Sequence, residues 1–191
     1  MHLARIHDPV LPLRRGQIFV CPYCHTKWQW FRRCSNSDFS LFIPTSITYE
    51  AHLKQYAHTM AEAIALMHWI GSVDGRGIEF ILAPPWGGII KADTVSNVLG
   101  DHCMWVCDFD LCRDMSMDEA GVEQAVKAFW HAEPFYPRPA TGDSLWFDFR
   151  EQYLRTSEER LECGLLDESI CNHRKTLSQL FIQIVEKRES D

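Results

Sequence analysis

Apolar residues recur at helical spacing over residues 48–69, and this pattern constrains the fold more than any other feature of the chain. The residues that make the pattern are Leu53, Tyr56, Ala57, Met60, Ala63, Ile64 and Met67. A spacing of three and four residues places them along one side of a helix, and that side must be buried against other elements. Gly71 stands where such a helix would end. The sequence therefore predicts a long helix that packs inside the domain.

Three further helices follow from similar patterns. Ser116 with Glu119 forms a capping box, which predicts a helix over 117–131. A second helix face is marked by Trp146, Phe149 and Tyr153. The last helix is expected to begin near Asn172 or Thr176, where one apolar side starts.

Short apolar runs predict strands between these helices. Residues 78–83 and 104–109 suit buried strands, and 17–20 suits a shorter one, whereas 89–99 is ambiguous. At 191 residues with 46% hydrophobic content, the chain can bury a core of one domain. The predicted fold class is α+β, mainly helical, with two or more short strands and no doubly wound sheet.

The chain divides into two unequal parts. Residues 1–47 show no sustained period and are interrupted by prolines, so we expect an irregular, poorly ordered N-terminal segment. Residues 48–191 are expected to form the helical domain. Within it, the proline-rich connector 134–139 is predicted to be packed through Phe135 and Tyr136, because these large apolar rings favour burial.

Charge and composition narrow the function classes. The formal charge of −7 argues against general attraction to nucleic acid or to anionic membranes. Residues 1–40 carry six basic side chains against two acidic ones, a balance of +4 that leaves −11 for the remainder. The chain has no apolar stretch of membrane-spanning length and no signal-peptide centre at its start, so an intracellular protein, cytoplasmic or nuclear, is expected. In that compartment the eight cysteines are expected to be thiols or metal ligands instead of disulfides.

Several sequence blocks over about residues 50–155 resemble a protein family of filamentous fungi that is known as a zinc finger protein domain of unknown function. The blocks are MAEAIALMHW at 60–69, Asp74, IEFIL at 78–82, WVCDFDLC at 105–112, GVEQAVKAFW at 121–130, EPFYPRP at 133–139, and Leu145, Trp146, Phe149, Arg150, Glu151 and Tyr153. Longer members of this family have an additional N-terminal half. The resemblance implies that the chain corresponds to the back half of the family's domain.

The family's pattern in turn resembles the C-terminal lobe of protein kinases and aminoglycoside phosphotransferases. In that pattern a helix ends in a histidine, an acidic loop and a strand follow, and an Asp-Phe motif comes next. Here the matching positions are His68, Asp74, the strand 78–82 and the sequence Asp-Phe-Asp at 108–110. The resemblance therefore implies a kinase-like C-lobe fragment.

Four carboxylates are the candidates for binding a cofactor in such a lobe. Asp74, Glu79, Asp108 and Asp110 would suit Mg²⁺ or a nucleotide if they converge, because carboxylates are ligands of hard cations. The alternative is that Asp108 and Asp110 are solvated side chains of a turn at a strand end. No glycine-rich phosphate loop precedes the first helix, no strand lysine is placed to hold phosphates, and the catalytic loop is altered. Phosphotransfer is therefore not expected.

A cysteine motif near the N-terminus has three interpretations. Cys21, Cys24, Cys34 and His25 could supply the thiolate and imidazole ligands that Zn²⁺ prefers. The sequence Cys-Pro-Tyr-Cys at 21–24 also resembles a glutaredoxin active site, which predicts a thiol oxidoreductase. The third reading is that the motif has no chemical role. The sequence leaves all three open.

The function expected from these observations is that of a non-catalytic, kinase-like interaction or regulatory module. Zn²⁺ and Mg²⁺ are the candidate cofactors, and neither is assigned by the sequence. Because a C-lobe core normally packs against another lobe, we expect a protein partner or self-association to cover the remaining apolar surface. A zinc-binding module and a thiol oxidoreductase are the alternatives.

Overall fold

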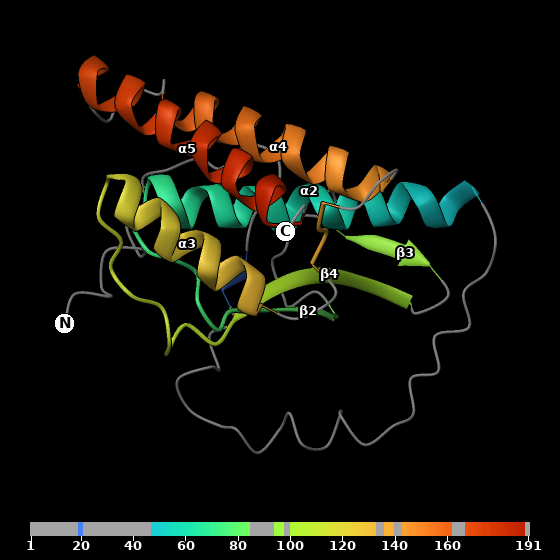
Figure 1. Ribbon diagram of the computed structural model, residues 1–191. Coiled ribbons are helices and arrows are strands. Elements are labelled where there is room, and N and C mark those ends of the chain that lie inside the picture. The colour runs from blue at the N-terminus through green and yellow to red at the C-terminus, as the bar shows by residue number, and fades with distance from the viewer. Residues whose placement is uncertain are drawn as a thin grey trace.

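Where the structure describes the chain, it forms a mainly helical α+β fold in which four helices lie to one side of a small sheet (Figure 1). The computed structural model describes residues 19–20, 47–84, 94–97, 100–132, 136–139, 143–161 and 167–189. The predicted fold class is confirmed at this level. None of the described helices is long and apolar enough to cross a membrane.

The described helices follow the sequence patterns closely. They are α2 (Ile47–Trp69), α3 (Glu119–His131), α4 (Ser144–Leu161) and α5 (Glu168–Glu189). Only α5 departs clearly, because it begins earlier than the predicted Asn172 or Thr176. The Cys171 amide donates to the carbonyl of Asp167 at 2.9 Å, and the buried Cys171 thiol donates to the carbonyl of Leu161 at 2.8 Å. The helical hydrogen bond to Asp167 and the tertiary contact to Leu161 together support an additional N-terminal turn that carries no apolar period.

The cap of α3 also differs from the predicted capping box. Asp118 is the N-cap, and its carboxylate accepts from the Gly121 amide at 2.9 Å. The Ser116 hydroxyl donates to the same carboxylate at 2.7 Å instead of capping the helix itself. The Ser116 carbonyl lies so close to Gly121 that a Cβ there would be 1.8 Å away. A carboxylate nearer the helix start therefore takes the capping role, which aspartate fills as well as serine does.

The sheet is built around β4 (Gly100–Cys107). Its partners are antiparallel β2 (Glu79–Ala83), antiparallel β3 (Val95–Asn97) and parallel β1 (Phe19–Val20). β1 and β2 fall in the predicted runs, and β3 lies in the stretch that was ambiguous. β4 overlaps the predicted run 104–109 but begins earlier, at Gly100, and ends at Cys107. A long central strand with short neighbours is consistent with the few apolar runs of the sequence.

The two faces of the sheet are distinguished by register. Phe80 lies opposite Val106, and both pack in the core with the helices. Ile81 lies opposite Trp105, and because side chains alternate along a strand, these two point to the other face. We call this second face the far face: it comprises Glu79, Ile81, Ala83, Cys103, Trp105 and Cys107.

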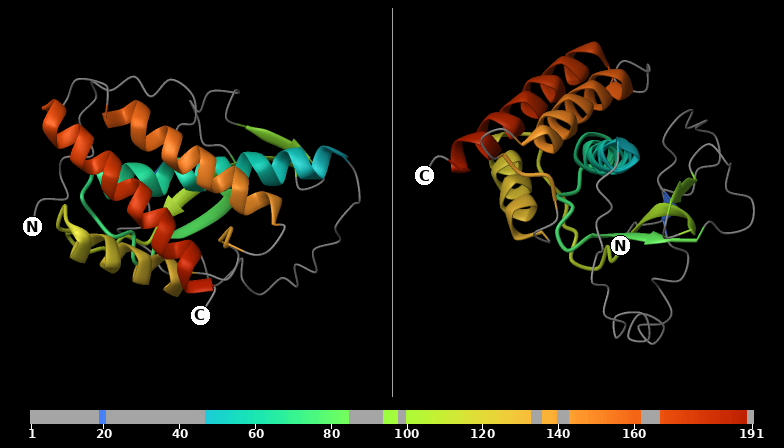
Figure 2. Two further views of the ribbon diagram at one scale, coloured as in Figure 1. Left: turned by 45° about the horizontal axis from the view of Figure 1, so that its top comes forward. Right: turned by 90° about the vertical axis from the view of Figure 1, so that its right-hand side faces the viewer.

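Aromatic side chains from α3, α4 and α5, three helices that Figure 2 draws as ribbons, form the centre of the helical layer. Phe149 stacks on Trp146 at 5.6 Å and on Tyr153 at 6.2 Å between ring centroids. Phe129 lies 5.7 Å from Phe149, and Phe181 lies 5.0 Å from Tyr153. The predicted apolar face of α4 is thus the face that α3 and α5 cover.

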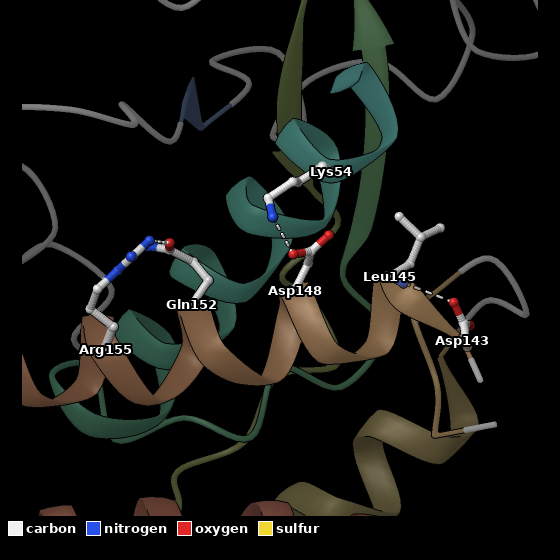
Figure 3. A network of polar contacts seen from close by, with 6 residues as sticks. All are labelled: Lys54, Asp143, Leu145, Asp148, Gln152 and Arg155. Atoms are coloured by element: carbon white, nitrogen blue, oxygen red, sulfur yellow. Dashed lines mark hydrogen bonds and ion pairs between the residues drawn. The ribbon is translucent and has the colours of Figure 1, made fainter. Parts of the chain in front are cut away.

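Polar contacts join α2 to α4 along the edge of this core (Figure 3). The Lys54 ammonium donates to the Asp148 carboxylate at 2.5 Å. Deeper in the interface, the Gln152 amide donates to Glu62 at 2.7 Å and accepts from the Arg155 guanidinium. The exposed ion pair contributes little to stability, whereas the half-buried contact between Gln152 and Glu62 links the two helices deeper in the interface.

The described part of the proline-rich connector is packed, as predicted. Tyr136 is buried, its hydroxyl donates to the Ile78 carbonyl at 3.2 Å, and its ring meets Phe80 and Phe129 edge to face. Phe135 lies outside the described residues. Burial of Tyr136 ties the connector to β2 and α3 together.

Candidate functional site

Asp74 lies at the centre of the polar contacts between the two motif loops. It is only 3% exposed, although it carries a carboxylate. Its Oδ1 accepts from the backbone amides of Arg76 at 3.1 Å and Arg113 at 3.0 Å, and its Oδ2 accepts from the Gln124 side chain at 2.8 Å. Both oxygens are therefore used inside the fold, which is how a buried carboxylate avoids an uncompensated cost.

The backbone around Asp74 is paired with the segment that follows the Asp-Phe-Asp motif. The Asp74 amide donates to the Arg113 carbonyl at 3.0 Å, and the Met115 amide donates to the Ser72 carbonyl at 2.8 Å. An isolated antiparallel bridge joins Val73 to Asp114 between them. The loop after α2 and the loop after β4 thus form one hydrogen-bonded unit.

His68 is packed behind this unit at the end of α2. It is 1% exposed, its Nδ1 lies 2.9 Å from the Tyr153 hydroxyl, and its ring meets Phe181 at 4.9 Å. Burial lowers the pKa of His68 to about 4, against an opposing effect of the backbone and charge of Asp74. His68 is therefore neutral at pH 7 and serves as a core side chain.

This neutral histidine predicts a loss of stability in mild acid. The unfolded chain takes up the His68 proton near pH 6.5 and the folded chain only near pH 4, so stability is full above the higher value and falls as pH drops between the two. The slope in this window should be about 1.4 kcal/mol per pH unit. Urea unfolding at several values between pH 7.5 and 4.5 measures it.

His68→Asn provides the control for that slope, because the amide keeps a hydrogen-bonding group beside Tyr153 without titrating. We expect its stability curve to be shallower than that of the wild type by about one proton. Some slope should remain, because burial also lowers the pKa of His58. Parallel curves for the two proteins would show that His68 is not the titrating group.

The other three predicted carboxylates lie at the ends of strands. Glu79 opens β2 opposite Cys107, the last residue of β4. Asp108 follows directly in a left-handed conformation with φ of 61°, which aspartate adopts more readily than most residues. Asp110 is exposed in the next turn. The chain therefore reverses sharply at the motif, and this agrees with the alternative of a turn at a strand end.

The Cys112 thiol lies within electrostatic reach of two of these carboxylates. Burial raises the pKa of its thiol to about 12, with further contributions from the charges of Asp74 and Asp108. Its sulfur donates to the Arg76 carbonyl at 3.5 Å. Asp74 and Asp108 therefore share one neighbourhood, in which the thiol stays protonated and unreactive.

The predicted ligand sets have different outcomes. Among the residues that the structure describes, no three His, Cys, Asp or Glu side chains are grouped so that they could hold a metal ion. Binding of Mg²⁺ or a nucleotide by the four carboxylates stays a prediction. Cys21, Cys24, Cys34 and His25 lie outside the described residues, so the zinc and redox interpretations of that motif also stay predictions.

Gln124 was not anticipated as part of this site. It lies on α3, 50 residues after Asp74, and also donates to the Asp114 carbonyl at 3.1 Å. A glutamine within a helix carries no spacing signal for such a contact. Only its position on the side of α3 that meets both loops makes it a partner of Asp74.

The fold and this carboxylate-centred loop unit define a mixed α+β, mainly helical domain. The sequence model of a family described as "Zinc finger protein", a domain of unknown function, matches residues 104–164. This region runs from within β4 through α3 and α4. No curated protein and no solved structure matches the chain.

Proposed function

We propose that this chain is a non-catalytic, kinase-like interaction or regulatory module. The order of its parts supports the kinase-like reading: α2 ends at His68 and Trp69, a loop with Asp74 follows, and the β2 and β4 strands lead to Asp108. Asp108 itself follows the last residue of β4 and has a left-handed backbone conformation. The remaining question is whether such an arrangement carries out phosphotransfer.

The hydrogen bonding of Asp74 is the observation that carries the non-catalytic reading. A general base must present a free lone pair to the group that it deprotonates. Three donors occupy most of the lone-pair sites of the Asp74 carboxylate, and because the side chain is almost fully buried, a substrate hydroxyl has little access to what remains. Asp74 therefore acts as a structural link between the two loops.

Exposed apolar side chains support an interaction role. In the described part of the chain, five large hydrophobic residues are at least 37% exposed: Ile70, Leu82, Leu111, Phe147 and Ile170. Two of them, Ile70 and Leu111, belong to the loops that Asp74 joins. Apolar surface beside a rigid loop unit is typical of sites that bind protein partners.

The direct test is nucleotide turnover by the purified full chain. We expect no ATP hydrolysis and no phosphate transfer above the level of an Asp108→Asn variant, with Mg²⁺ or Mn²⁺ present. Asparagine is chosen because it tolerates the left-handed conformation and removes only the charge. Hydrolysis that disappears in Asp108→Asn but persists in Glu159→Gln, an exposed site on α4, would overturn the proposal.

Zinc binding through the N-terminal cysteine motif is the second candidate; the matched family is described as "Zinc finger protein", and its match covers residues 104–164 and not this motif. Its ligands would be Cys21, Cys24, Cys34 and His25. Metal analysis of the purified chain tests it: near-stoichiometric zinc that is lost in a Cys21→Ser/Cys24→Ser variant would favour this function. Cys112→Ser is the matched control, because the high pKa of this thiol makes it a poor metal ligand.

A further inference from the structure

The β4 part of the far face is buried although no described helix lies against it, whereas Glu79, Ile81 and Ala83 on β2 are half-buried. Cys103, Trp105 and Cys107 are 2%, 7% and 3% exposed, yet none of them belongs to the core shared by the four helices. Figure 2 shows those helices on the opposite side of the strands. The Cys103 and Cys107 thiols donate to carbonyls of β2 at 3.7 Å each. These contacts lie within the sheet, so they do not explain what shields these side chains from solvent.

Strand β1 identifies the part of the chain that reaches this sheet. Phe19 pairs with Trp105 and Val20 with Val106, in parallel orientation. These two residues lie midway along residues 1–46, the N-terminal segment of the chain.

Charge is consistent with the same occupant. Residues 1–40 carry a balance of +4, whereas the rest of the chain carries −11. Opposite net charges favour association of the two parts and weaken the competition from a second acidic copy of the chain.

We infer that the far face is an intramolecular docking surface whose occupant is the N-terminal segment that carries β1. Backbone pairing of β1 with β4 supplies the orientation, and burial of Cys103, Trp105 and Cys107 supplies the favourable free energy. This inference does not rest on the proposed function: the cover is the same whether or not the loops bind nucleotide.

Thiol protection in the full chain tests this inference. Phe19→Pro/Val20→Pro removes both backbone donors of β1, because proline has no N–H. In native buffer we expect N-ethylmaleimide to label Cys103 and Cys107 about tenfold faster, or more, than in the wild type. Cys171 is the internal control, because it is buried between α4 and α5 and should keep its rate.

Phe19→Leu/Val20→Ile is the matched control variant. It changes the same two positions but keeps the amides and the apolar character, so both far-face thiols should remain protected. Unchanged labelling of Cys103 and Cys107 in the proline variant, with amide exchange in β4 also unchanged, would overturn the inference.

Photo-cross-linking tests the inference even if the proline variant does not fold. A photo-reactive benzoylphenylalanine in place of Ile81 puts a cross-linker on the far face opposite Trp105, without altering β1. We expect cross-links within one chain to peptides from residues 1–46, identified by mass spectrometry. Cross-links to residues 85–93, or to a second copy of the chain, would instead assign the face to another occupant.

Discussion

Replacing Phe149 with alanine should lower the free energy of unfolding by about 3–5 kcal/mol, the range for losing a fully buried large aromatic. The ring is 0% exposed and lies between Trp146 and Tyr153, with Phe129 beside it. Removing it opens a cavity among side chains from three helices, which cannot close without moving them. Since domains of this size are stable by only about 5–15 kcal/mol, the variant should be near the limit of folding at 37 °C.

Phe147→Ala is the control for this effect. Phe147 lies two residues away on the same helix and is 56% exposed, so we expect a change within about 0.5 kcal/mol. Urea midpoints of both variants beside the wild type provide the measurement. Equal midpoints for the two variants would mean that α4 presents a different face to the core.

Asp74→Ala is expected to destabilise the fold by about 2–5 kcal/mol, because it leaves two backbone donors and the Gln124 amide without their acceptor, each costing about 1–3 kcal/mol where buried. The expected structural result is that the loops after α2 and β4 separate. Hydrogen exchange should show it as faster exchange of the Arg76 and Arg113 amides. A denaturant midpoint gives the size of the effect.

Asp110→Ala is the matched control, because Asp110 is an exposed carboxylate of the neighbouring motif and should change stability by less than about 0.5 kcal/mol. This pair also bears on function. A stable Asp74→Ala variant with unchanged amide exchange would show that the carboxylate is not needed for the fold. That result would contradict the structural role of Asp74 on which the proposed function depends.

The strands and the N-cap of α3 show how much of the fold can be predicted from local sequence patterns. Strands β2 and β4 were predicted from apolar runs, because a buried strand needs continuous apolar side chains. The capping residue was predicted two positions too early: Ser116 has the spacing of a capping box with Glu119, but Asp118 accepts from the Gly121 amide. The close approach of the Ser116 carbonyl to Gly121 depends on the path of the loop, which no short-range rule contains.

The amino-acid sequence by itself determined the positions of the long helices, the apolar faces of α2 and α4, and the burial of Tyr136 in the connector. These features repeat over a few residues and reflect short-range packing and backbone preferences. Only the tertiary structure decided the role of Asp74, since its donors come from positions 2, 39 and 50 residues away. It also decided the early start of α5 and the two different faces of the sheet. A carboxylate followed by glycine looks the same in a sequence whether it faces solvent or three donors, because burial is a property of the whole fold.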